Sequence, residues 1–434
     1  MSDNDSTEQI SDGSYGKINI IDENTIMKTT EKFNKNGMYY RQNIQEIVFL
    51  SCVEHNNIVK TKKIRLTDNE IQIEQEKGEQ TLHDYINNNN KKTRMIHFKF
   101  IFFQLVKVLF FIHKNNFIHG DIKPNNILLS SNMTIKLIDF GGICSFRIND
   151  NHKPICTPSF CPPEGWAQLN IKCLNSKFDV WSLAMTMYFY SCRKYLLDFK
   201  DDKTIYYINE FKWSFNKYYH HNIDYIKNII DDQAFKLLEK MLMYDPDDRI
   251  STDELYYDQY FSEFTKEQID KIKFISEFDS SYMSNYMIND WKQRKNLINW
   301  VYEYLESNNM LDHLVLTIWN IDRYINLKKI KITSQNKNLF GAASIIISSI
   351  LLANKYMHHD DILKIIPKYI SKIKLINIID DMMTTLNFKI YAPTFDYIIK
   401  NNRELVNYTK IYNMLSDKKY IGLDQHFLAE IYLN

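Results

Sequence analysis

Two short segments in the first third of the chain contain acidic, amide and basic side chains within a few positions of one another. Residues 119–129 read H-G-D-I-K-P-N-N-I-L-L, and residues 135–141 read I-K-L-I-D-F-G. Phosphoryl transfer needs a carboxylate near the attacking hydroxyl and oxygen ligands for Mg²⁺, because the protein mainly positions groups and balances charge. Two carboxylates, an amide and a lysine of these segments are of the required types. These residue types are therefore compatible with phosphoryl-transfer chemistry.

The two segments resemble the catalytic and metal-binding loops of eukaryotic protein kinases. The resemblance implies that Asp121 orients the substrate hydroxyl and accepts its proton, and that Lys123 steadies the transferred phosphate. It also implies that Asn126 and Asp139 hold Mg²⁺ bridged to the ATP phosphates. The expected cofactors are ATP and Mg²⁺.

Upstream segments resemble the nucleotide-binding strands of the same family, in the same order. Residues 11–18, S-D-G-S-Y-G-K-I, resemble the glycine loop with Ser11 in place of its first glycine, and residues 25–28, T-I-M-K, resemble V-A-I-K. The resemblance implies an ion pair between Lys28 and Glu46 on the following helix. The implied ATP-binding residues are Ile10, Gly13, Gly16, Ile18 and Lys28.

Downstream, residues 157–164, T-P-S-F-C-P-P-E, resemble the loop that closes the activation segment. Thr157 matches a threonine held at the catalytic aspartate, which together with Lys123 is a mark of serine/threonine kinases. Arg249 matches the buried arginine that pairs with Glu164. The ordered set of motifs predicts the α+β bilobal kinase fold, with a small β-rich N-lobe and a helical C-lobe.

Two features argue against control by activation-loop phosphorylation. Gly120 replaces the arginine that grips a loop phosphate in many kinases. Residues 146–156, F-R-I-N-D-N-H-K-P-I-C, contain no Ser, Thr or Tyr. Ser14 and Tyr15 coincide with positions where cyclin-dependent kinases are restrained by phosphorylation, but they are equally read as the tip of the glycine loop.

Within the family, the cyclin-dependent kinases fit best. Residues 13–16, G-S-Y-G, and 43–47, N-I-Q-E-I, resemble their glycine loop and the start of their next helix. Residues 159–164, S-F-C-P-P-E, depart from the W-Y-R-A-P-E of proline-directed members. A preference for Ser-Pro or Thr-Pro is therefore not implied.

From Arg294 the sequence changes to helical periodicity, and it resembles a cyclin box of five helices. The matching residues expected to take part in docking are Arg294, Trp300, Asp322 and Lys355. Ile379 stands where cyclins have the glutamate that grips the kinase, with Asp380 beside it. The apolar run 339–352 is shorter than the ~20 residues that cross a bilayer, and it predicts a buried central helix.

The expected domains are the kinase N-lobe at 1–80, the C-lobe at 81–264, a helical linker at 265–290, the cyclin-like domain at 291–400 and an extension at 401–434. The expected function is an ATP-dependent serine/threonine kinase whose cyclin-like domain activates it in cis. Three alternatives stay open: a pseudokinase scaffold, a cyclin-like domain that recruits a separate kinase or transcription factor, and an unrelated helical bundle.

Bulk composition mainly limits the partners. With 54 basic and 53 acidic residues, the net charge of +1 gives no electrostatic case for nucleic acid or an anionic membrane, and protein substrates are expected. Cys144, Cys156 and Cys161 lack the spacing of a zinc site, so free thiols are expected. The polar N-terminus predicts no secretory signal and hence the cytoplasm or nucleus, of a host cell if the Asn- and Ile-rich composition is viral.

Overall fold

The computed structural model describes ten ranges of the chain: residues 9–13, 16–35, 37, 39–145, 156–166, 175–197, 223–264, 291–352, 370–390 and 408–416. Ser14, Tyr15, Lys355 and the linker expected at 265–290 lie outside these ranges. The chain divides into two compact units, one of Met1–Lys28, Glu54–Lys63 and Glu74–Ile272, the other of Thr29–Val53, Ile64–Ile73 and Lys273–Asn434.

The N-terminal part contains a five-stranded sheet with the order β1-β2-β3-β5-β4. The strands are β1 (Gln9–Gly13), β2 (Gly16–Asp22), β3 (Thr25–Glu31), β4 (Thr61–Leu66) and β5 (Glu70–Glu76). The hairpin of β1 and β2 is antiparallel, with Gly13 opposite Gly16. Its turn is where the sequence places the glycine loop, and the positive φ of Gly16 favours glycine there.

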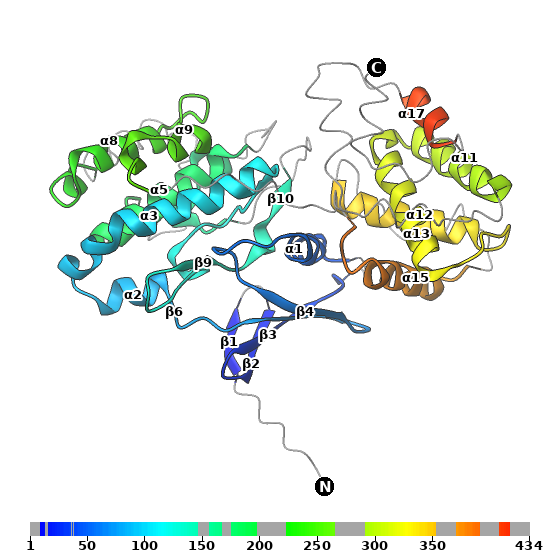
Figure 1. Cartoon of the computed structure of the whole chain (residues 1–434), viewed down its shortest axis with the longest axis horizontal. Helices are drawn as coiled ribbons and strands as arrows, with labels where there is room; N and C mark the ends of the chain where they lie inside the picture. The colour runs from blue at the N-terminus through cyan, green and yellow to red at the C-terminus, as the bar shows by residue number, and fades with distance from the viewer. Residues whose placement is uncertain are drawn as a thin grey trace, which may run out of the picture. The chain divides into compact units, whose positions relative to one another are not determined.

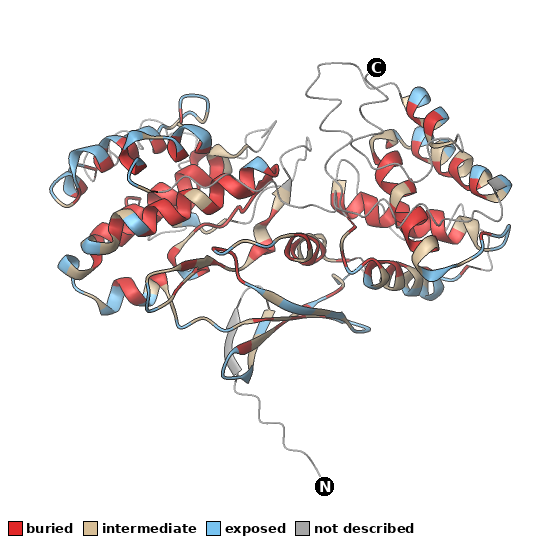
Figure 2. Cartoon of the chain, in the orientation of Figure 1, coloured by how far each residue is buried: buried red, intermediate tan, exposed pale blue. Residues whose placement is uncertain are grey.

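The helices after the sheet form an apolar core. They are α2 (Leu82–Asn88), α3 (Lys91–Lys114), α5 (Lys177–Cys192), α8 (Asp232–Met241) and α9 (Thr252–Tyr256). Buried residues run along most of α3 and α5, which contact each other, and α3 also contacts α9 (Figure 2). A helix that is apolar on nearly every side belongs inside a domain.

Among the described residues, α3 is the helix whose length and composition would allow it to cross a membrane. Two thirds of its apolar window are buried inside the protein, at 67%. Core helices of folded domains pass the same test of length and hydropathy. The burial of α3 against α5 and α9 therefore accounts for its apolar sequence.

The C-terminal helices pack around one central helix, as the sequence predicts. They are α11 (Trp291–Ser307), α12 (Leu314–Lys328), α13 (Lys337–Leu352), α15 (Lys372–Thr385) and α17 (Tyr408–Leu415). The central helix α13 contacts α11, α12 and α15, and Figure 1 shows them beside one another. A side chain at Gly341 would place its Cβ 2.6 Å from the Trp300 ring, so glycine permits the close contact of α11 with α13.

A buried ion pair joins α11 to α12. The guanidinium of Arg294 donates two hydrogen bonds to Asp322, at 2.9 Å from Nε and 2.6 Å from Nη2. It also donates to the carbonyl of Leu415 in α17 at 2.9 Å. These contacts lie within the helical domain and give both residues a structural role, while a docking role for them stays a prediction.

Asp322→Ala is expected to destabilise the helical domain by about 3–5 kcal/mol, because it leaves a buried guanidinium without its carboxylate. Chemical denaturation of the full chain measures the effect. The matched control is Lys328→Ala on the same helix, because Lys328 pairs with Asp381 at a site where both side chains are 40% exposed. That change is expected to cost less than about 1 kcal/mol, and equal losses in the two variants would contradict the buried pair.

Candidate active site

A short hairpin holds the two chemistry-bearing loops side by side. Asp121 lies between β7 (Phe117–Ile118) and the 3₁₀ turn η1 (Pro124–Asn126). Asp139 lies between β9 (Ile135–Leu137) and η2 (Phe140–Gly142). The strand β8 (Ile127–Leu129) pairs antiparallel with β9, with Ile127 opposite Leu137. This register brings the end of the loop that carries Asp121 to the start of the loop that carries Asp139. There the amide of Ile138 donates to the carbonyl of Asn126 at 3.0 Å.

The carboxylate of Asp121 is buried and accepts hydrogen bonds from three side chains. Lys123 Nζ donates to Oδ2 at 2.7 Å, and Asn126 Nδ2 donates to the same oxygen at 3.0 Å. Thr157 donates to Oδ1 from its hydroxyl at 2.8 Å and from its amide at 3.0 Å. Lys123 Nζ also donates to the Thr157 hydroxyl at 2.8 Å. The structure thus brings together Asp121, Lys123, Asn126 and Thr157, as the sequence predicts.

The expected metal and phosphate ligands lie in the same region. Lys28 Nζ on β3 donates to Asp139 Oδ1 at 2.9 Å, an ion pair of which both members are mostly buried. Asp139 adopts a left-handed conformation, with φ of 60°. A carboxylate and an amide fit Mg²⁺, which is usually held by one or two protein oxygens together with substrate phosphates. Among the described residues, no three or more His, Cys, Asp or Glu side chains cluster to hold a metal by themselves.

Asp179 on α5 holds the backbone of the catalytic loop. Its carboxylate accepts from the amide of His119 at 2.8 Å and from the amide of Gly120 at 2.9 Å. His113 on α3 lies 2.8 Å from the same carboxylate through Nε2. Burial lowers the pKa of His119 below its usual value of 6.5, so this imidazole is neutral at pH 7. The catalytic loop is therefore held by the buried carboxylate of Asp179, which was not among the site residues predicted from the sequence.

Gly120 lets the catalytic loop approach the metal loop closely. Its φ is +83°, and a Cβ at this position would lie 2.6 Å from the carbonyl oxygen of Gly142. In turn, a Cβ on Gly142 would lie 2.9 Å from the carbonyl oxygen of His119. Both obstacles are backbone atoms, which cannot rotate away. Two glycines therefore make this backbone contact possible.

The end of the activation segment is fixed by the predicted buried pair. Arg249 donates to both carboxylate oxygens of Glu164, at 2.6 and 3.0 Å, and to the carbonyl of Lys177 at 2.7 Å. Glu164 lies in the short helix α4 (Pro163–Trp166). The guanidinium of Arg249 also lies over the ring of Trp181, 5.0 Å from its centroid. A bidentate pair of this kind fixes position as well as charge.

The expectation of free thiols is wrong for two of the cysteines. The structure joins Cys156 and Cys161 in a disulfide, with Cα atoms 5.6 Å apart. The pairing depends on the 3₁₀ turn η3 (Pro158–Phe160), which brings the two residues together and which cysteine spacing alone does not reveal. Cys144 is outside the disulfide.

Asp380 contacts the segment that precedes α1 (Arg41–Cys52), within the second compact unit. Asp380 on α15 accepts from Lys32 Nζ at 2.8 Å and from the Tyr39 hydroxyl at 2.7 Å. Lys32 also donates to the carbonyl of Thr67 at 2.6 Å, and its side chain is 1% exposed. The sequence pointed to Asp380 as the neighbour of an expected glutamate, but no motif pointed to Lys32 or Tyr39.

The remaining expected residues are placed only in part. The side chain of Ile10 is outside the described set, although the backbones of Ile10 and Gly13 form part of β1. Ile18 lies on β2. Glu46 is buried on α1, and its pairing with Lys28 stays a prediction because the two belong to different compact units.

Comparisons with known proteins agree with this geometry. Residues 5–261 match the protein kinase domain, and residues 260–391 match the cyclin N-terminal domain. A carbon catabolite-derepressing protein kinase of Candida glabrata is 28% identical over an alignment of 260 residues that covers 58% of this chain and 40% of that protein. Cell division control protein 2 homolog 2 of Trypanosoma brucei brucei is 26% identical over an alignment of 294 residues that covers 61% of this chain and 84% of that protein.

Mitogen-activated protein kinase 3 of Arabidopsis thaliana is 26% identical over 282 residues, covering 58% of this chain and 75% of that protein. The chain spans less than half the length of the Candida kinase. The kinase match nevertheless covers more than half of the 434 residues. The protein therefore belongs to the protein kinase family, as a kinase domain similar to cyclin-dependent kinases fused to a cyclin domain.

Proposed function

We propose that the chain is an ATP- and Mg²⁺-dependent protein serine/threonine kinase whose own cyclin domain activates it in cis. The observation that supports the chemistry is the shared carboxylate of Asp121, which Lys123 and Thr157 contact together. The observation that supports activation in cis is the contact of Asp380 with Lys32 and Tyr39.

The site residues divide the work of phosphoryl transfer among them. Asp121 orients the substrate hydroxyl and receives its proton, while Lys123 lies beside it to balance charge on the transferred group. Lys28 would bind the α- and β-phosphates, and Asn126 and Asp139 would hold Mg²⁺. When bound, Mg²⁺ neutralises charge on the phosphates. Lys28 and Asp139 form an ion pair with each other at 2.9 Å.

Specificity for Ser and Thr is proposed from the pair of Lys123 and Thr157. Lys123 donates to both the Asp121 carboxylate and the Thr157 hydroxyl, so its ammonium group is held between the proposed base and the activation segment. In the families that the chain resembles, this lysine and threonine accompany serine/threonine kinases. The peptide sequence around the acceptor stays open.

The cyclin domain is proposed to act on α1, the helix that carries Glu46. Two donors converge on Asp380 from the segment leading into α1, and α1 contacts the central helix α13. Cys52 at the end of α1 is buried near Lys389 and Arg323, and burial raises its pKa to about 11. The start of the α1 segment and α1 itself therefore contact residues of the helical domain.

The burial of Lys32 makes the contact energetically demanding. An ammonium group that is almost fully removed from water requires a counter-charge, and Asp380 supplies it within hydrogen-bonding distance. Removing one partner of such a pair costs about 3–5 kcal/mol, because the other charge is left buried. Asp380 is therefore the residue whose loss should release the helical domain from the α1 segment.

Asp121→Asn is expected to lower kcat for transfer from ATP to a protein substrate by about 10²-fold or more, because the amide cannot accept the proton. Radiolabelled ATP with a generic basic protein measures the rate. Asp253→Asn is the matched control, because Asp253 lies on α9 and forms an exposed pair with Lys114. Activity that is absent from the unmodified chain, or equal in both variants, would favour the pseudokinase scaffold.

Asp380→Asn is expected to lower kcat/KM by about tenfold or more, because it removes the counter-charge of Lys32. The control is Asp381→Asn at the next position of α15, because Asp381 accepts from Tyr324 and Lys328 inside the helical domain. A loss that is equal in both variants would indicate general damage to α15.

A double-mutant cycle isolates the contact itself. Lys32→Met combined with Asp380→Asn is expected to lose less activity than the sum of the two single losses, since both remove one interaction. Losses that simply add would contradict a functional pair between these residues.

Activation in cis predicts that specific activity does not change on dilution. A tethered domain acts at an effective concentration of order mM, far above any assay concentration. Specific activity of the full chain is therefore expected to stay constant over about a thousandfold dilution from micromolar protein. A fall in specific activity with dilution would instead show that the cyclin domain acts on a second molecule.

A further inference from the structure

Three cysteines gather around the part of the chain that holds Thr157. Cys161 belongs to an apolar cluster with Ile118 and Phe178. Cys144 on β10 (Cys144–Ser145) and Cys156 pack against this cluster, and Cys156 is bonded to Cys161. β10 pairs with β7, whose strand leads directly into the catalytic loop. Thiol chemistry is therefore concentrated next to the loop that carries Asp121.

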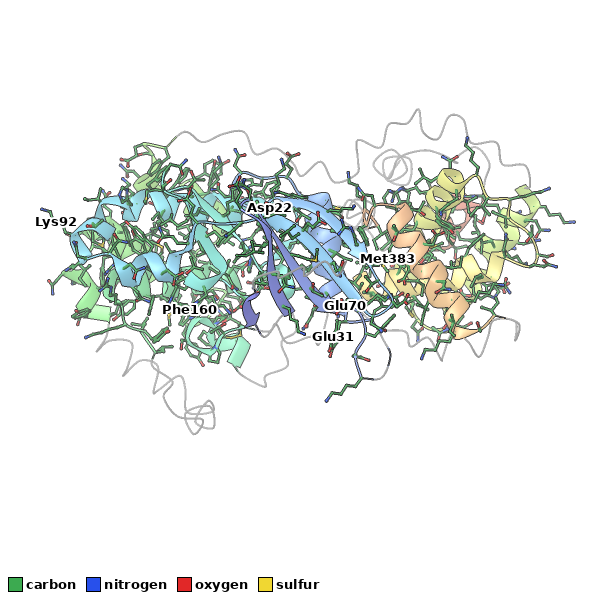
Figure 3. The ribbon with its side chains drawn as sticks, turned by 90° about the horizontal axis from the view of Figure 1, so that it is seen from below. Asp22, Glu31, Glu70, Lys92, Phe160 and Met383 are labelled. Atoms are coloured by element: carbon green, nitrogen blue, oxygen red, sulfur yellow. A yellow bond between two sulfur atoms is a disulfide. The ribbon has the colours of Figure 1, made fainter. Side chains whose placement is uncertain are left out.

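The disulfide encloses the turn that presents Thr157. Thr157 directly follows Cys156, and its carbonyl accepts from the amide of Phe160 at 2.9 Å. Phe160, labelled in Figure 3, is buried and lies edge-on to the ring of Phe189 on α5. The bond therefore closes a short ring in which one member is anchored in the core and another contacts the Asp121 carboxylate.

The surroundings leave room for the bonded sulfur. Gly165 follows Glu164 in α4, and a Cβ at this position would lie 2.6 Å from Cys161 Sγ. It would also lie 2.9 Å from the ring of Phe178. A larger residue at position 165 would therefore displace either the sulfur or the ring. Glycine at this position keeps the site of the bond open.

The other described cysteines lie in different chemical environments. Burial raises the pKa of Cys52 to about 11 and that of Cys192 to about 12, so both thiols stay protonated at neutral pH. The thiolate is the form that attacks a disulfide. Cys156 is only half-buried and lies two residues before the exposed Pro158. Reagents in solution therefore reach the activation segment before they react with the core thiols.

We propose that Cys156 and Cys161 form a reversible modification site that small-molecule disulfides close and dithiols open, and that the closed form holds Thr157 on Asp121. In closing, the Cys156 thiolate attacks glutathione disulfide and releases one glutathione thiolate. The Cys161 thiolate then attacks the Cys156 sulfur and releases the second. The two cysteines are oxidised by two electrons, which reduce the glutathione disulfide to two thiols.

As regulation of the proposed kinase, this inference rests on the function proposed above. The activation segment offers no hydroxyl acceptor between residues 146 and 156, and Gly120 cannot bind a phosphate. A covalent bond around the Thr157 turn provides the ordering that a phosphate provides in other kinases. The closed form is therefore the more active form.

The test uses the full chain after incubation with either glutathione disulfide or dithiothreitol. Remaining thiols are blocked with iodoacetamide, and the peptides are mapped by mass spectrometry. A peptide in which Cys156 and Cys161 are bonded to each other and carry no alkyl group is expected after oxidation, and the same peptide with both cysteines alkylated after reduction. Cys144→Ser is the matched control from the same cluster, and it is expected to leave the cross-link intact. Separate alkylation of the two cysteines after oxidation, or loss of the cross-link in Cys144→Ser, would overturn the site.

Kinetics on the same samples test the regulation. The oxidised chain is expected to have a kcat/KM for the protein substrate about threefold or more above that of the reduced chain, with little change in the KM for ATP. Cys156→Ser is expected to have one activity under both conditions. Equal activities of the two forms of the unmodified chain would overturn the regulatory role. A cross-link in a chain without kinase activity in either form would contradict the proposed function and leave the thiol site standing.

Discussion

The organisation of the kinase domain depends on one buried carboxylate. A charged oxygen removed from water must be matched by donors, and Asp121 takes them from its own loop and from the activation segment. Because Thr157 donates through both its hydroxyl and its amide, satisfying this charge also determines where the activation segment lies. Asp179 on α5 acts in a similar way, because its buried carboxylate accepts hydrogen bonds from two backbone amides of the same loop. Electrostatic demand thus orders segments that the hydrophobic core alone would leave free to move.

Two lysines near the end of β3 form ion pairs with carboxylates from different parts of the chain. Lys28 pairs with the metal-loop carboxylate of Asp139, and Lys32 pairs with Asp380 of the helical domain. Only three residues separate them, and in an extended chain this corresponds to about 13 Å between Cα atoms. Along the backbone, the lysine that pairs with the cyclin domain is therefore close to Lys28, the proposed phosphate-binding lysine.

Local patterns in the sequence were sufficient for the motif residues and for the central helix α13, because kinase loops carry their chemistry in short contiguous segments. Contacts that no motif carries were missed. The ion pair of Lys32 joins positions 348 residues apart, and although the cyclin resemblance drew attention to Asp380, no motif pointed to Lys32 as its partner. The disulfide depends on a turn that bends one loop, and spacing alone favoured free thiols. Arg294 and Asp322 were recognised, but the pattern could not show that they face each other inside the domain.

The close backbone contact between Gly120 and Gly142 restricts which substitutions the two loops can accept. Each glycine leaves the space that the other loop's backbone occupies, so a side chain at either position meets a main-chain carbonyl. An arginine at position 120 would push the two loops apart before it could bind any phosphate. A phosphate-binding arginine at this position would therefore require further changes in the facing loop.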